Sequence, residues 1–257
     1  MTYLWSAVLF IFTFFIVVQY LQLTGKKSNE DITKWRKAAF ISGAFLFLIA
    51  QANPVLEWAN SLFFVYMMQQ TVTYFIVPIL ILLGLTDSLL KPIYSHKKVT
   101  SILKIFTKPF VILPLFNILF SIYYVPFLFD MIMSSPISRA VSMIILLPLS
   151  FCMWWPVVSP AKNNTNTTLQ PMLKIIYIVG MGAFMTPLGA FIIFSNKVLY
   201  TTYQSLPQLY NISLINDQQA GGVAMKIIQI IVYSIMIAYS FSEAVRLDRD
   251  QPEMNYE

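Results

Sequence analysis

Long apolar runs decide what this chain can fold into. A helix needs about 20 mostly apolar residues to cross the hydrocarbon of a bilayer, and seven segments approach or exceed that length. They span 2–23, 37–51, 61–85, 109–129, 139–159, 172–194 and 222–247. The second is the weakest, because Gln51, Asn53 and Pro54 close it early unless it extends toward Trp58. The runs predict an all-α bundle of seven membrane-spanning helices.

The overall composition supports a membrane protein. Hydrophobic residues make up 58% of the 257 residues and charged residues 11%, whereas soluble domains have about 45–50% and 25%. A soluble fold of this length cannot bury so much apolar surface. This argues against a soluble enzyme and against a disordered or fibrous protein. We expect one membrane domain over residues 1–257, with a short acidic tail at 248–257.

Basic residues gather on alternate connections between the runs. Fourteen of the 17 Lys and Arg lie after the first, third and fifth runs or in the tail, and three lie on the other side. Because Lys and Arg favour the cytoplasmic face, the N-terminus is predicted outside and the C-terminus in the cytoplasm. We expect the basic loops, with an amphipathic segment at 99–108, to attract anionic lipid. The net charge of +6 then requires no nucleic-acid partner.

Two scarce residue types limit the chemistry. The chain has one Cys, Cys152, and one His, His96. A single Cys excludes an intramolecular disulfide and a Cys-based zinc site, and a single His excludes a poly-His metal site. A Ser-His-Asp triad finds no support in the bundle. We therefore assign no catalytic residue and expect a protein that is not an enzyme.

Four charged residues fall near the predicted outer ends of the helices: Asp130, Arg139, Asp217 and Lys226. Ionisable groups at membrane depth are costly, so each is a candidate functional residue. The alternative is that the two cations pair with the two acids and clamp the bundle. Asp217 is either an acceptor for a partner or pocket, or an N-cap of the seventh helix or an ion-pair partner of Lys226 or Arg139.

The third run carries a polar stripe. Tyr66, Gln69, Gln70 and Thr73 share one helical face, which must meet either a cavity or another helix. Interhelical polar bonds in membranes contribute only about 0.6 kcal/mol on average, but helix contact remains the simpler alternative. The stripe makes Tyr66, Gln69 and Gln70 candidate pocket residues.

Methionine is abundant, with 13 in the chain. Thioether sulfur is a soft ligand that suits Cu(I), and Met67, Met68 and Met143 fall in the predicted outer half. The alternative is that these flexible side chains fill gaps in the core. If the chain holds a cofactor, we therefore expect Cu(I) on these three residues.

Three passages carry a resemblance to a known family. They are Met67-Met68-Gln69 through Val77-Pro78 to Leu82-Leu83-Gly84-Leu85; Trp154-Trp155-Pro156-Val157 with Ser159-Pro160; and Leu199-Tyr200-Thr201-Thr202-Tyr203 leading to Asp217-Gln218-Gln219-Ala220-Gly221-Gly222 and Met225. Together they resemble the bacillus-type CtaG family of cytochrome c oxidase assembly proteins across roughly residues 60–240.

The resemblance implies a multi-pass protein of the bacterial plasma membrane with oxidase subunits as partners. It would assist assembly or copper-centre maturation of a haem-copper terminal oxidase. Gln218, Gln219, Gly221 and Gly222 belong to its most specific passage. We expect the glycine pair to precede the seventh helix, where it would permit close backbone approach and expose N–H groups.

The chain departs from the family at its metal-binding positions. Where the family has His, this sequence has Tyr66, Gln70, Arg139 and Met143, and where the family has Trp it has Lys226. We interpret the chain as a divergent, His-less relative. Either methionines handle copper, or metal binding was lost and the scaffold kept. A small-molecule transporter and a membrane scaffold without a ligand remain alternative functions.

The topology gives the first prediction. We expect a reporter that functions in the cytoplasm to be active when it is fused after Glu257, and a reporter that functions only outside the cell to be inactive there. The reason is that the basic loops favour the cytoplasmic face of the membrane. Reporter pairs with opposite compartment requirements measure this directly. Activity of an extracytoplasmic reporter at that fusion site would overturn the charge argument.

Overall fold

A computed structural model describes residues 2–26, 33–90, 101, 103, 105–158, 169–204 and 212–249, and every regular element in these ranges is helical. The long elements are α1 (Thr2–Lys26), α2 (Lys34–Gln51), α8 (Pro109–Tyr123), α10 (Pro136–Val158), α11 (Pro171–Ile193) and α13 (Leu214–Arg249). The shorter ones are α3 (Val55–Ser61), α4 (Phe63–Thr71), the π-helical turn η1 (Val72–Ile76), α5 (Val77–Gly84), α9 (Pro126–Met133) and α12 (Thr201–Gln204).

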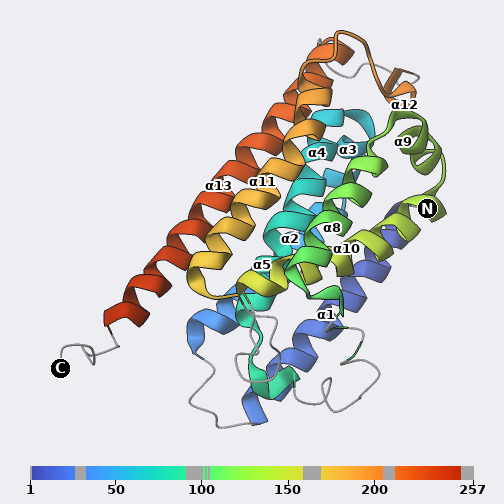
Figure 1. Cartoon of the computed structure of the whole chain (residues 1–257). Helices are drawn as coiled ribbons and strands as arrows, with labels where there is room; N and C mark the ends of the chain where they lie inside the picture. Colours follow the sequence, from blue (N-terminus) through green and yellow to red (C-terminus); the bar gives the residue numbers. More distant parts are fainter. Residues whose placement is uncertain are drawn as a thin grey trace.

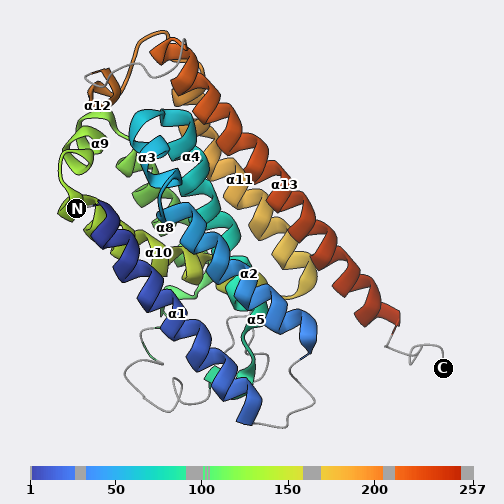
Figure 2. The ribbon, with the colours of Figure 1, turned by 180° about the vertical axis from the view of Figure 1, so that it is seen from behind.

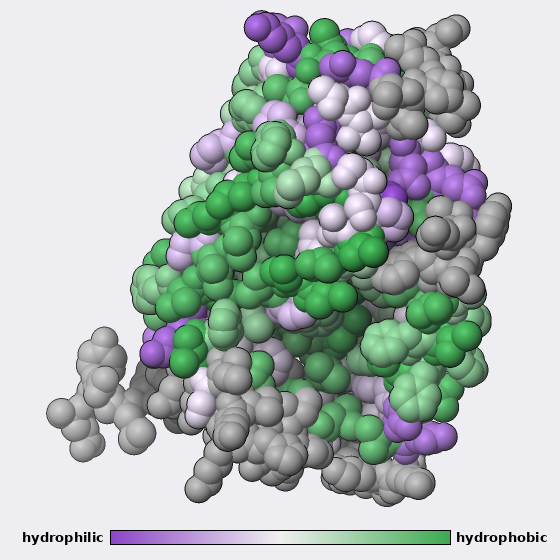
Figure 3. Space-filling model, turned by 90° about the vertical axis from the view of Figure 1, so that its right-hand side faces the viewer, coloured by the Kyte–Doolittle hydropathy of each residue, from purple (hydrophilic) through white to green (hydrophobic). Residues whose placement is uncertain are grey.

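Five helices are long and apolar enough to cross a bilayer. They are Ala7–Gly25 of α1, the α4–η1–α5 rod (Phe63–Gly84), α10, α11 and α13. Two bent pairs also qualify: α2 with α3, bent by 47°, and α8 with α9, bent by 75°. Counting each pair as one span gives seven. Hydrophobic side chains cover the middle of the face in Figure 3, with hydrophilic ones gathered toward the upper end. The all-α membrane bundle is confirmed.

Three helix boundaries differ from those expected. The run 109–129 is not continuous, because α8 ends at Tyr123 and α9 begins at Pro126. Val125 is extended between them, as a residue before proline prefers. The second run bends at an extended Ala52. The seventh helix begins at Leu214 rather than at Gly222, so the Asp217–Gly222 passage is helical.

The helices form one bundle. Helices α11 and α13 run side by side along one flank, α1 lies on the opposite flank, and α2 runs between them (Figures 1 and 2). The start of α1 and the end of α13 lie toward opposite ends. Which end faces the cytoplasm stays a prediction. Most of the basic segments at 91–104 and 159–168, and the tail from 250 onward, fall outside the described residues.

The end of α5 is held by α1 and α2. A Cβ on Gly84 would lie 2.5 Å from Cβ of Phe40, so only glycine allows this approach of α5 to α2. The hydroxyl of Tyr20 donates to the Gly84 carbonyl at 2.8 Å, and Arg36 donates to the Leu85 carbonyl at 3.1 Å. These contacts fix the α4–η1–α5 rod against α1 and α2.

An aromatic cluster fills the other end of the bundle, beside α9 and α12. Phe63 stacks on Tyr200 with ring centroids 4.7 Å apart, and Phe129 lies 4.4 Å from Tyr200 and 6.3 Å from Tyr203. All four side chains are buried. This cluster packs α4, α9 and α12 together. We call this the α9–α12 end.

Candidate functional site: a polar cavity in the bundle

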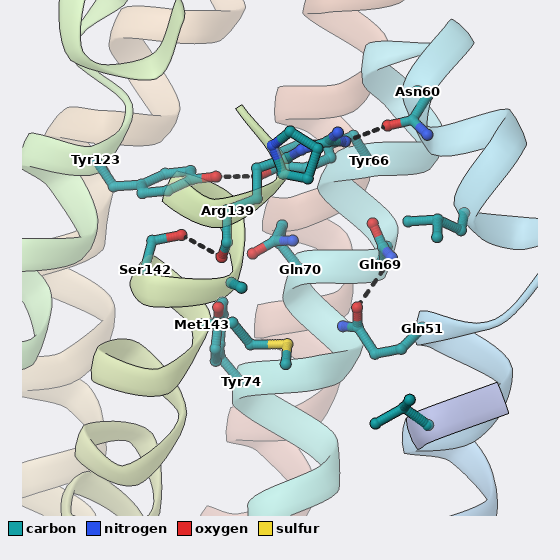
Figure 4. A pocket seen from close by; sticks show the side chains of 14 residues that line it. Gln51, Asn60, Tyr66, Gln69, Gln70, Tyr74, Tyr123, Arg139, Ser142 and Met143 are labelled. Carbon is teal, nitrogen blue, oxygen red and sulfur yellow. Dashed lines mark hydrogen bonds between the residues drawn. The ribbon is translucent and has the colours of Figure 1, made fainter. Parts of the chain in front are cut away.

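A cavity of about 290 Å³ lies among α1, α2, α3, α4, η1, α8 and α10. Nine of the residues that line it carry a polar side-chain group: Gln51, Asn60, Tyr66, Gln69, Gln70, Tyr74, Tyr123, Arg139 and Ser142. The other five are apolar: Val8, Leu56, Pro136, Ala140 and Met143. Figure 4 shows these side chains converging from several helices. The wall is largely apolar with several polar groups that converge on it, and this makes the cavity the strongest candidate site in the described part of the chain.

The predicted stripe of α4 faces this cavity, but its members do different things. Tyr66 shares a hydrogen bond with Tyr123 of α8, and Gln69 donates to the Ala50 carbonyl of α2 at 2.6 Å. The two bonds join helices, as the simpler alternative expected. Gln70 forms no hydrogen bond with another described residue, and its amide points into the cavity (Figure 4).

Thr73, which does not line the cavity, holds the lining residue Gln51 in place. The Gln51 amide donates to the Thr73 hydroxyl at 3.1 Å, which joins the end of α2 to η1. Both side chains are buried, and buried amides and hydroxyls that are paired avoid a desolvation penalty. This part of the cavity wall is therefore fixed in place.

Arg139 is the one charged residue among those lining the cavity. It projects from the first turns of α10, and its Nη1 donates to Oδ1 of Asn60 at 2.7 Å. Its Nε is buried and has no hydrogen-bond partner. Among the described residues, no acid forms an ion pair with it. The alternative in which Arg139 pairs with Asp130 or Asp217 is therefore wrong.

Asp217 instead caps a different helix. Its Oδ2 accepts from the Phe63 N–H at 2.7 Å and its Oδ1 from the Phe64 N–H at 3.1 Å. The first N–H groups of a helix have no partner within that helix, and Leu62, just before α4, is extended and provides no side-chain cap. The carboxylate, only 5% exposed, supplies that cap from 153 residues away. Asp217 therefore sets the position of α4.

Asp130 does the same for α12. Its two oxygens accept four hydrogen bonds, from the backbone N–H and hydroxyl groups of Thr201 and Thr202, at 2.7–3.0 Å. In turn Tyr203 donates to the Ala59 carbonyl at 2.9 Å. Burial raises the pKa of the Tyr203 phenol, so it stays a protonated donor. The α9–α12 end is thus tied together by carboxylate caps rather than ion pairs.

Lys226 lies on the α11 side of α13 and does not line the cavity. Its Nζ donates to the Thr186 hydroxyl at 3.4 Å. A Cβ on Gly189 would lie 2.3 Å from Cε of Lys226, so the lysine stem crosses a gap left by glycine. Because α13 begins at Leu214, Lys226 sits about three turns into the helix. The alternative in which Lys226 pairs with Asp217 is therefore wrong, because no ion pair joins these two described residues.

The remaining residues of the Asp217–Gly222 passage pack the bundle. Gln218 accepts from the Leu199 N–H at 2.7 Å, and Gln219 donates to the Ser195 carbonyl at 3.1 Å, so both hold the connection before α12. A Cβ on Gly221 would lie 2.8 Å from Phe63, and one on Gly222 would lie 2.8 Å from Ile193. The predicted close approach is present. The expected exposure of N–H groups is wrong, because both glycines lie inside α13.

The three candidate methionines are not brought together. Met143 lines the cavity, Met67 is fully buried beside Gly221, and Met68 is 36% exposed. No cluster of three or more His, Cys, Asp or Glu exists in the described ranges. One thioether beside a guanidinium does not fit a resident copper ion, because like charges repel. Copper binding stays a prediction.

Some lining residues carried no sequence signal. Asn60 lies in the last turn of α3 and Tyr123 is the last residue of α8, where no periodic pattern singles them out. Gln51 stood out only as a polar interruption of the second apolar run. Four positions named from the family resemblance, Tyr66, Gln70, Arg139 and Met143, all line this one cavity. Residues 66–70 and 139–143 come from separate helices, so their meeting was not visible in either segment alone.

These features define a multi-pass membrane protein with a cavity near one end on which polar side chains from several helices converge. The family model for the cytochrome c oxidase caa3 assembly factor (Caa3_CtaG) matches residues 12–246. The chain belongs to this family. Comparisons with curated proteins and with solved structures give no match.

The cap from Asp217 to α4 gives a stability prediction. Asp217→Asn keeps one oxygen acceptor but removes the charge and the second acceptor at the start of α4. We expect the free energy of unfolding to fall by about 1–3 kcal/mol, measured by thermal unfolding of the purified protein in detergent.

Asn216→Ala is the matched control. Asn216 is exposed, and its side chain forms no hydrogen bond with another described residue, so its stability should stay within about 0.5 kcal/mol of wild type. Equal loss in both variants, or none in Asp217→Asn, would contradict the cap.

Proposed function

We propose that this protein assists assembly of a haem-copper terminal oxidase in the bacterial plasma membrane, acting on oxidase subunits during copper-centre maturation. The observation that carries the proposal is the cavity that unites Tyr66, Gln70, Arg139 and Met143. Four side chains from two separate helices line one chamber in a member of an oxidase assembly family. We therefore place the assembly function at this cavity.

The same cavity argues that the protein does this work without a copper ion of its own. Arg139 places a positive charge in the chamber. A copper ion would have to enter beside that charge with Met143 as its one sulfur ligand from the lining. We infer that the protein works as a membrane scaffold during maturation rather than as a copper carrier.

Transport is the second candidate function. A cavity in the membrane with converging polar groups and helices broken at the two bent pairs are features that transporters use at their substrate sites. This reading requires no oxidase partner. The experiment below separates the two functions, since a transporter would leave oxidase assembly intact unless copper is its cargo.

Deletion of the gene tests the proposal. We expect activity of the cognate terminal oxidase to fall to background, because its copper-bearing subunit does not mature, and added copper not to restore it. Oxidase activity in isolated membranes, with and without copper in the growth medium, measures this. A plasmid copy of the wild-type gene is the control.

Each other outcome has a distinct meaning. Unchanged oxidase activity would contradict an assembly role and favour the transporter. Rescue by copper would show that the protein supplies metal and would overturn the scaffold reading. Metal analysis of the purified protein would then be expected to find Cu(I), and Met143→Leu, compared with Met68→Leu, would test whether the cavity thioether holds it.

A further inference from the structure

The cavity contains one charge, on Arg139, that no acidic side chain among the described residues neutralises. Arg139 is half-buried, and among the described residues it has one hydrogen-bond partner, Asn60, for its five N–H donors. Its Nε is buried without a partner in the described part of the chain, and no described acid pairs with it. Removing a cation from water is costly unless an anion and hydrogen bonds compensate. Lys174, the buried cation at the other end, does have such compensation, in Glu243 at 2.6 Å.

The surroundings of Arg139 suggest what would compensate it. Gln70 points into the cavity without a hydrogen-bond partner among the described residues, and the hydroxyl of Ser142 is satisfied by the Arg139 carbonyl at 2.8 Å. The polar groups beside the guanidinium are thus neutral, and of these two only the Gln70 amide is available to a ligand. One cation with neutral neighbours balances one negative charge, and a guanidinium fork matches the two oxygens of a carboxylate.

The rest of the lining suggests an apolar body for the ligand. Val8 is 53% exposed and, with Leu56 and Pro136, forms an apolar part of the cavity wall. Helix α1, which carries Val8, has 22% of its spanning window buried, the lowest share among the five unbroken spans. A ligand bound here would meet a cation at one point and hydrocarbon at another.

We propose that the cavity binds an amphipathic organic carboxylate, with its carboxylate on Arg139 and its apolar body against Val8, Leu56 and Pro136. The carboxylate would accept hydrogen bonds from the guanidinium and from the Gln70 amide. This goes beyond the assembly role, because it names a ligand and does not require an oxidase partner.

The test uses octanoate as the probe and the full chain in nanodiscs of zwitterionic lipid. Octanol has the same chain length without the charge, so it controls for partition into lipid. We expect octanoate to bind saturably and to raise the unfolding temperature, and octanol to do neither at equal concentration. Arg139→Gln should weaken octanoate binding by at least about 10-fold, as expected for loss of a charge-assisted pair.

Two further variants keep the test decisive if Arg139→Gln fails to fold. Gln70→Glu keeps Arg139 but places a carboxylate on the same cavity wall, so it should abolish octanoate binding and stabilise the protein without ligand. Lys226→Gln removes a cation outside the cavity and should bind octanoate as wild type does.

The proposal fails under any of three results: equal effects of octanoate and octanol, unchanged octanoate binding in Gln70→Glu, or an equal loss in Lys226→Gln. Tighter saturable binding of octyl phosphate than of octanoate would reassign the site to a phosphate headgroup and overturn the carboxylate proposal.

Discussion

Two hydrogen bonds from the start of α4 to the Asp217 carboxylate hold the candidate site in position. They join residues far apart in the sequence at a place where a helix end would otherwise bury unpaired N–H groups. Hydrogen bonds to a charged group contribute about 1.5–3 kcal/mol each, and a buried carboxylate left without donors would be strongly unfavourable. Because α4 carries Tyr66, Gln69 and Gln70, its position sets one wall of the cavity.

The remaining walls depend on the same principle of satisfying polar groups across helices. Gln69 and Gln51 bind α2 to the central rod, and Tyr66 meets Tyr123 of α8. Each of these bonds occupies a polar group that apolar surroundings could not solvate. Two lining side chains keep polar groups that no described residue pairs: the guanidinium of Arg139 has unpaired N–H donors, and the amide of Gln70 has no partner. The cavity is therefore chemically suited to an anion, even though the family resemblance places imidazole at these positions.

This difference links the site to function. A scaffold can retain the helices, caps and chamber of an oxidase assembly family while the chamber changes from binding a cation to binding an anion. Such a protein would serve the same assembly process by recognising a different group. The proposed scaffold role and the proposed carboxylate site both follow from the charge of Arg139.

The sequence predicted features that depend on local pattern. Run lengths gave the membrane helices, and the 3.6-residue period placed Tyr66 and Gln70 on one face. Contacts between distant segments were beyond such patterns. Nothing near Asp217 shows that its partners are the N–H groups of Phe63 and Phe64. The start of α13 was missed because its first turns are polar, with Asn216, Asp217, Gln218 and Gln219, and so have low hydropathy. Hydrogen bonds of Gln218 and Gln219 to the preceding connection nonetheless stabilise these turns.

The most direct test of the account measures terminal oxidase activity in membranes from strains that carry Arg139→Gln or Lys226→Gln in place of the wild-type gene. Activity is normalised to the amount of each variant in the membrane. If the cavity is the functional site, Arg139→Gln loses most oxidase activity while Lys226→Gln, whose cation lies outside the cavity, retains it. Normal activity in Arg139→Gln, or an equal loss in both strains, would contradict the account.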